Sequence, residues 1–291
     1  MGELMATIIR GGRVLDVRAH RADAADVLVT GDAITEIGAP GMPAPPDAVA
    51  LDARGFLLHP GLINAHTHAH GNLAKGMGDR WTLELLLTAG SWISGNRTLE
   101  DKHLSAKIGA AEMVLKGCTA SYDLPLEFPA PTPEGLHAVG SAYAAVGMRA
   151  VVAPMVADRT FYEAIPGLME VLPPAWQQDV EKLRPAPWKT SVENMRRALV
   201  EWKLDRDQVR LAVAPTIPHH CSDEFIRACV ALAAEHGVGM HTHVAESKVQ
   251  AIVGLQRYGK TLTAHLDDLG VVGPSFTGRF CALFSASTTQ T

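Results

Sequence analysis

The sequence is poor in aromatic residues and has no excess of positive charge. Aromatic residues make up 5% of its 291 residues, and 31 Asp and Glu residues outnumber 26 Lys and Arg residues. A surface that binds nucleic acid needs a basic stripe for the phosphates, and the charges of this chain form no such stripe. We therefore expect no nucleic-acid partner.

Long apolar runs and paired cysteines are also absent. No uninterrupted apolar segment reaches the roughly 20 residues that a helix needs to cross a bilayer, and the N-terminal residues lack the basic start and apolar core of a secretory signal. The 4 cysteines show no Cys-x-x-Cys spacing, which is typical of reduced thiols. These absences predict a cytoplasmic protein with no membrane partner, and they leave homo-oligomer formation open.

The composition and rhythm of the chain predict two parts. Hydrophobic residues make up 47% of the sequence, enough for a sizeable core and a second, smaller domain. Residues 1–55 contain short apolar segments separated by turns such as Gly11-Gly12, which predicts a small antiparallel sheet. From residue 56 onward strands and helices alternate, which favours parallel strands with helices outside. The Pro-rich segment 156–189 interrupts this pattern, either as a lid over the site or as an excursion on the outside.

Local signals predict several elements in detail. Thr98 can cap a helix over residues 98–116 with Asp101 three residues on, and Ser191 and Ser222 can cap two later helices. A doubly wound sheet and a barrel both fit the alternation. Polar residues end several predicted strands, which favours the barrel, because barrel enzymes build their sites at these ends. The predicted strands are 118–123, 149–153, 210–215 and 238–244, with a further one at 280–284.

The pair His66 and His68 follows a short apolar segment, Leu62-Ile63, that comes after a Pro-Gly turn. In an extended strand alternate side chains share a face, so both imidazoles should point the same way. Two neutral imidazoles can then occupy two positions around a divalent transition metal. Two histidines at this spacing also occur by chance, so the pair alone does not establish a metal site.

A second group of candidate residues ends the predicted strand 238–244. His243 lies at its end, and Glu246 follows where the chain turns toward a helix. A bound metal lowers the pKa of water toward ~7, and a nearby carboxylate can accept the proton and return it. An ordinary strand end with a helix-capping glutamate is the alternative. His241 lies deeper on the same face, where a hydrogen-bonded core histidine is favoured.

Taken in order, these motifs make the chain resemble the amidohydrolase superfamily, in particular its cytosine-deaminase-like and chlorotriazine-hydrolase-like branch. The resemblance covers about residues 7–277 and implies a (β/α)8 TIM-barrel fold with a small β-sandwich built from segments near both chain ends. The matching segments are 60–68 (Pro-Gly-Leu-Ile-Asn-Ala-His-Thr-His), 72–76, 117–123, 147–152, 214–218, 221–222 and 243–246.

The resemblance also implies one divalent metal ion, zinc first and iron or manganese as alternatives, held by His66, His68 and His243. Glu246 would shuttle protons for water that attacks an amino-bearing ring carbon or an amide-like carbon. The expected reaction is therefore hydrolytic deamination of a small heterocycle.

Substrate-binding candidates follow the strand that ends near Pro215. Members acting on adenosine-type substrates commonly have a histidine where this chain has Thr216, which favours cytosine-, guanine- or triazine-like rings. His219 and His220 either line the pocket or form a polar loop before the Ser222 cap, and the loop is favoured.

The sequence departs from the family pattern at its C-terminal end. The family also requires a histidine ending strand six and an aspartate ending strand eight, and neither is found; His265 is expected on a helix surface. We therefore expect three segments. Residues 1–55 form an N-terminal β-sandwich segment, residues 56–277 form a C-terminally truncated barrel of five to six strands, and residues 278–291 form an aberrant tail. An impaired enzyme is expected; the alternatives are a non-catalytic metal- or partner-binding protein and a hydrolase of cyclic amides or imidazolones.

Overall fold

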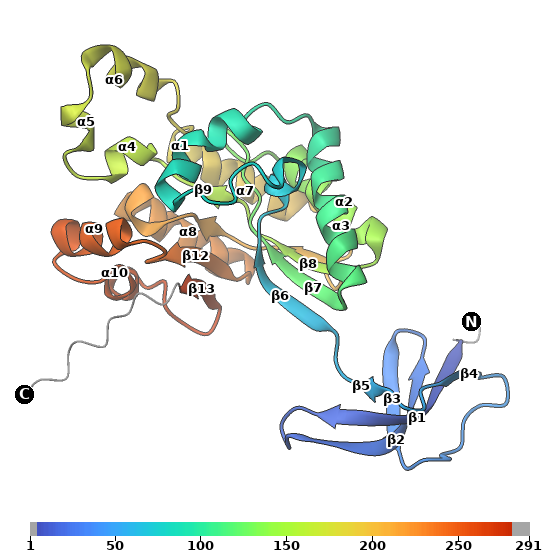
Figure 1. Ribbon diagram of the computed structural model, residues 1–291. Coiled ribbons are helices and arrows are strands. Elements are labelled where there is room, and N and C mark those ends of the chain that lie inside the picture. Colours follow the sequence, from blue (N-terminus) through green and yellow to red (C-terminus); the bar gives the residue numbers. More distant parts are fainter. Residues whose placement is uncertain (1–4, 281–291) are drawn as a thin grey trace, which may run out of the picture. The chain divides into compact units, whose positions relative to one another are not determined.

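The computed structural model describes residues 5–280. These residues divide into two compact units, with the boundary between Leu62 and Ile63. The first unit is a single sheet with the strand order β3-β2-β1-β4, and β5 also pairs with β1 (Figure 1). Its strands are β1 (Ala6–Asp16), β2 (Arg21–Thr30), β3 (Ala33–Gly38), β4 (Val49–Asp52) and β5 (Leu57–Leu58).

The first sheet differs from the prediction in two ways. It is mixed, because β1 pairs antiparallel with β2 but parallel with β4 and β5. In addition, Gly11-Gly12 does not end a strand: β1 continues through a register shift between Ile9 and Gly12. Gly11 has a φ of +78°, which a glycine adopts without strain, and its N–H donates to the Asp26 carboxylate at 3.1 Å.

The second unit is built from alternating strands and helices, as predicted. Its strands lie in the spatial order β6-β7-β8-β10, with β9 beside β11 and β12 beside β13. The pairings β7–β8, β8–β10, β9–β11 and β12–β13 are all parallel. The strands are β6 (Leu62–Thr67), β7 (Cys118–Asp123), β8 (Arg149–Val152), β9 (Met155–Val156), β10 (Val209–Leu211), β11 (Ala214–Pro215), β12 (Met240–Val244) and β13 (Phe276–Phe280).

Single bridges join the three pieces of this strand series. Leu126 pairs with Met155, and Val213 pairs with Met240, both in parallel orientation. Within residues 5–280 the series does not close into a barrel, and β6 and β13 are its two ends. The last described strand is β13, at Phe276–Phe280. Apart from residue 280, the further strand expected at 280–284 lies outside the described residues, as does most of the expected aberrant tail.

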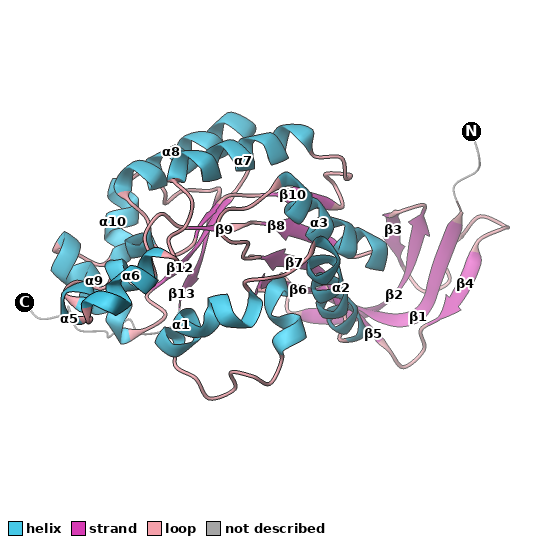
Figure 2. Cartoon of the chain, turned by 90° about the horizontal axis from the view of Figure 1, so that it is seen from above, coloured by secondary structure: helices cyan, strands magenta, loops and turns pink. Residues whose placement is uncertain are grey.

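Helices surround the strands of this unit (Figure 2). No helix within the described residues combines the length and the apolar character needed to cross a membrane. The helices are α1 (Leu83–Ser94), α2 (Leu99–Leu115), α3 (Pro133–Val146), α4 (Phe161–Ala164), α5 (Leu168–Val171), α6 (Pro174–Glu181), α7 (Trp188–Glu201), α8 (Asp223–His236), α9 (Lys248–Tyr258) and α10 (Leu262–Asp268), with the 3-10 turns η1 (Ala69–Ala74) and η2 (Pro218–His220).

The predicted caps hold for two helices and fail for one. Thr98 and Asp101 form a reciprocal capping box on α2, and the Ser222 hydroxyl accepts the Phe225 N–H at the start of α8. Ser191 instead lies buried inside α7, which begins at Trp188. Pro187, with φ fixed at −49°, already directs the chain into a helix, so α7 begins one turn earlier than predicted.

Candidate metal centre

His66 and His68 converge at the end of β6. His66 lies in the strand, and His68 is the residue that precedes η1. Their Nε2 atoms are 3.0 Å apart, and their rings meet edge to face at 86°. The strand alternation thus brings both imidazoles to one place, as the sequence predicts.

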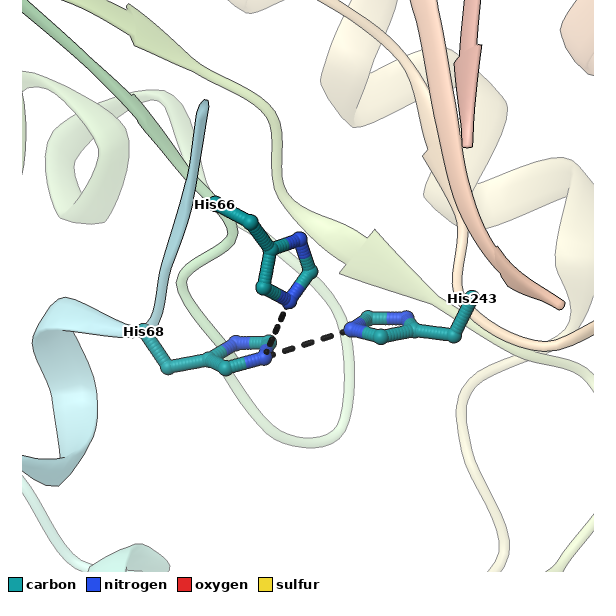
Figure 3. A group of neighbouring side chains, drawn as sticks. All are labelled: His66, His68 and His243. Atoms are coloured by element: carbon teal, nitrogen blue, oxygen red, sulfur yellow. Dashed lines mark hydrogen bonds between the residues drawn. The ribbon is translucent and has the colours of Figure 1, made fainter. Parts of the chain in front are cut away.

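His243 joins them from β12. Its Nε2 lies 3.2 Å from the Nε2 of His68, and the ligand atoms of the three histidines all lie within 4.8 Å of one another (Figure 3). Two nitrogens that share a tetrahedral zinc at 2.0–2.1 Å are separated by about 3.3 Å. The spacing of the three rings therefore suits one small divalent cation.

The outer nitrogens of two rings show which form these histidines adopt. His68 Nδ1 lies 2.9 Å from the Leu124 carbonyl oxygen, and His243 Nδ1 lies 2.7 Å from the Thr216 carbonyl oxygen. A carbonyl oxygen only accepts, so each Nδ1 carries the proton and donates it. In the neutral form of each ring the lone pair of Nε2 then points inward, and this is the form of histidine that binds a metal ion.

Glu246 lies in the turn between β12 and α9 and is half-buried. The preceding residue, Ala245, has a φ of +54°, an uncommon conformation for a residue with a side chain, so the turn leaves the strand sharply. The N-cap of α9 is Ser247, and the Glu246 N–H donates to the Gln250 side chain at 2.9 Å. The simple helix-capping role is therefore not the role of Glu246. Among the described residues, the cluster of candidate ligands contains the three histidines and not this carboxylate.

His219 and His220 precede the Ser222 cap, as predicted, but they are not exposed to solvent. Both residues lie in the turn η2 and are buried, because Arg159 and Arg257 hold the turn by donating to the His219 carbonyl oxygen at 3.3 and 2.9 Å. Burial, with Arg257 and Arg159 adding to it, lowers the pKa of His219 to about 4, and burial lowers that of His220 well below its usual value. Both rings are therefore neutral near pH 7.

His220 lies between the candidate metal centre and the 156–189 segment. His243 is among the groups that lower the pKa of His220, and the Phe161 ring of α4 lies 6.2 Å from the His220 ring. Thr216 contributes its backbone carbonyl to His243, as described above.

Sequence reasoning gave no role to Asp123, which ends β7. This residue is completely buried, and its Oδ1 accepts the Ala69 N–H at 2.8 Å, directly after His68. Burial raises its pKa to about 7, although the bonds from Ala69 and from the Tyr143 hydroxyl oppose the rise. The sequence signal that could have pointed to Asp123 was an acidic residue at the end of the predicted strand 118–123.

His265 does not lie on the surface, as was expected. It is buried on α10, stacks on Tyr258 at 3.6 Å and is 3.0 Å from the Asp223 carboxylate. The apolar pattern of the helix could not show that residues of α8 and α9 pack over His265 on α10. His265 does not join the three histidines of the candidate metal centre.

Comparison with known proteins agrees with this geometry. The amidohydrolase family pattern matches residues 57–288, well over half of the chain. The chain belongs to the amidohydrolase family. This result confirms the resemblance inferred from the sequence.

Curated relatives of this amidohydrolase include two deaminases. An 8-oxoguanine deaminase of Pseudomonas aeruginosa is 29% identical over 266 residues, which cover 88% of this chain and 56% of that protein. A 5-methylthioadenosine/S-adenosylhomocysteine deaminase of Syntrophobacter fumaroxidans is 31% identical over 236 residues, or 79% of this chain and 46% of that protein. The chain therefore spans about half the length of the curated relatives it matches.

Solved structures show the same fold. A triazine hydrolase from Arthrobacter aurescens has a TM-score of 0.77 at 24% identity, and an atrazine chlorohydrolase from the same organism, complexed with zinc, has a TM-score of 0.74 at 25% identity. Each alignment covers 94% of this chain and 60% of the other. These neighbours support a TIM-barrel-like α/β fold for this chain.

Proposed function

We propose that this amidohydrolase binds one zinc ion through Nε2 of His66, His68 and His243 and catalyses hydrolytic deamination of a small aminated heterocycle. The observation that carries the proposal is the convergence of three Nε2 atoms, two of them with lone pairs turned inward by carbonyl partners. Iron and manganese are the alternative metals. The strand series β6 to β13 is then the first part of a (β/α)8 barrel.

Three histidine ligands suit a catalytic site. Catalytic zinc commonly has three protein ligands and keeps the fourth position for water or substrate, whereas structural zinc is closed by four. When bound, the cation polarises the attacking water and the ring carbon's substituent. The three candidate ligands among the described residues are imidazoles, and a site of three neutral imidazoles binds a divalent cation more weakly than a site that adds a carboxylate.

Glu246 is proposed to move the proton. Two observations support this role: Glu246 follows His243 by three residues, and it lies at a sharp turn that leaves β12. Its carboxylate takes a proton from the attacking water and delivers it to the departing amine. His220, a buried neutral ring near His243, is proposed to donate to or accept from ring nitrogens of the substrate, with His219 and Thr216 shaping the same wall.

The relatives suggest where to look for the substrate. The deaminases named above act on an oxidised purine base and on adenosine-type nucleosides, and the hydrolases act on triazines. The sequence argument from Thr216 against nucleosides stays a prediction, so both classes belong in the assay.

The test measures ammonia released by the purified chain after loading with Zn²⁺, Fe²⁺ or Mn²⁺, each checked by metal analysis. The panel contains 8-oxoguanine, guanine, cytosine, methylthioadenosine, an aminotriazine and an imidazolone. We expect ammonia from at least one aminated ring, and Glu246→Gln should lower the rate by about 100-fold or more while metal content stays unchanged.

Two controls make the result decisive. Glu36→Gln changes an exposed glutamate in the first unit and should leave the rate unaltered. His243→Ala should lose both metal and activity. Stoichiometric metal binding without turnover on any substrate would replace the enzyme proposal by the non-catalytic metal-binding alternative.

A further inference from the structure

The outer nitrogen of His66 has a different kind of partner from those of His68 and His243. Two of the three rings donate to carbonyl oxygens, and these fix which nitrogen carries the proton. His66 Nδ1 instead lies 2.9 Å from Nε2 of another histidine, His241. Because an imidazole nitrogen can donate or accept, this contact alone does not fix the state of His66.

Thr277 decides the direction of that hydrogen bond. His241 Nδ1 lies 2.7 Å from the Thr277 hydroxyl oxygen, and that hydroxyl donates to the Met240 carbonyl oxygen at 3.3 Å. Having used its proton there, the hydroxyl accepts from His241 Nδ1–H. Nε2 of His241 then holds a lone pair and accepts the Nδ1–H of His66. In the neutral ring the Nε2 of His66, which faces His68 Nε2 at 3.0 Å, then carries a lone pair and no proton.

The opposite direction would block cation binding. If His241 carried its proton on Nε2, it would donate to His66 Nδ1, and the His66 proton would move to Nε2. That proton would then point at His68 Nε2, where the shared ligand has to bind. The sense of one hydrogen bond therefore separates a ring that can bind metal from a ring that cannot.

The surroundings of His241 hold its ring in place. His241 is 2% exposed, and its backbone N–H donates to the Val213 carbonyl oxygen at 2.9 Å. The centre of the Tyr122 ring lies 4.6 Å from the centre of the His241 ring. His241 and Thr277 are also direct partners in the parallel pairing of β12 with β13. The strand pairing thus sets the distance between them.

We propose that His241 and Thr277 are positioning residues that select the Nδ1-protonated form of His66 and so prepare its Nε2 for the metal. The inference rests on the proposed metal site but not on catalysis. It can therefore be tested by metal binding alone, separately from any activity.

The experiment titrates the full chain with Co²⁺ alone and follows the visible absorption of the bound ion, with Zn²⁺ affinity obtained by competition. His241→Leu removes the acceptor, and we expect metal affinity to fall about 10- to 100-fold. His241→Gln retains an acceptor at the position of Nε2 and should restore most of that affinity. Thr277→Val should show a smaller loss than His241→Leu, because Thr277 lies at an exposed position, and Thr277→Ser should match the unaltered chain.

Thr190→Val, an exposed threonine on α7, is the matched control and should bind normally. If His241→Leu does not fold, the Thr277 pair still gives the answer. Nitrogen NMR of the metal-free chain provides a second measurement and should show the His66 proton on Nδ1.

The outcomes distinguish the two proposals. Failure of the unaltered chain to bind Co²⁺ or Zn²⁺ would overturn the metal centre itself. Normal binding by the unaltered chain together with equal binding by His241→Leu and Thr277→Val, or a His66 proton on Nε2, would refute the positioning role alone.

Discussion

Replacing Asp123 by asparagine should change how the stability of the chain depends on pH. Complete burial raises the pKa of this carboxyl to about 7 from an ordinary value of 3.8. The folded state therefore holds a proton over a pH range in which the unfolded chain has lost it. The contribution of this carboxyl to the free energy of unfolding is fully present below its ordinary pKa of 3.8. It is lost as the pH rises toward the folded-state pKa of about 7.

The size of the effect follows from the two pKa values. Each pH unit between them changes the free energy of unfolding by about 1.4 kcal/mol, so the whole interval is worth on the order of 4 kcal/mol. Asparagine resembles the neutral carboxyl at every pH and keeps an oxygen for the Ala69 N–H. We expect the stability of Asp123→Asn relative to the unaltered chain to rise by up to this amount between pH 4 and pH 7.

The assay is urea unfolding at several pH values in the presence of a chelator, since a bound cation nearby would favour the ionised form. Asp26→Asn is the control, because the pKa of Asp26 is shifted in the opposite direction to that of Asp123. Burial of Asp26 acts to raise its pKa, but the N–H groups of Gly41 and Gly11 and the Arg10 guanidinium outweigh it, and the pKa is lowered. This control should lose stability most at neutral pH. A difference between Asp123→Asn and the unaltered chain that stays constant from pH 4 to pH 7 would refute the reasoning.

Two further predictions concern helices of the second unit. Thr98→Ala removes the cap that accepts the Asp101 N–H and should lower the unfolding free energy by about 1 kcal/mol in urea melts; no change would mean that water replaces the cap without cost. Gly140→Ala places a Cβ 2.7 Å from the Trp202 ring and should cost about 1–3 kcal/mol, seen as a lower melting temperature, whereas Gly273→Ala meets no atom within 4 Å and serves as its control. An unchanged melting temperature for Gly140→Ala would show that Trp202 moves aside freely.

The sequence predicted local features well because their signals lie within a few residues. The capping box of α2 and the strand Cys118–Asp123 were predicted from neighbouring residues. Mistakes arose where distant chain segments decide burial. His219 and His220 are buried because Arg159 and Arg257 anchor their turn, and His265 is buried because Tyr258 and Asp223 cover it.

The sequence by itself indicated the family and singled out the three histidines of the proposed metal site, because these residues stand in two short motifs at predicted strand ends. Only the tertiary structure decided how those rings are prepared for a ligand. His66 and His241 are 175 residues apart, and Thr277 lies on a separate strand, so no local pattern could show that they form one chain of hydrogen bonds. Strand pairing brings them together, and in the proposed site the direction of those bonds would set which nitrogen of His66 is available to a metal ion.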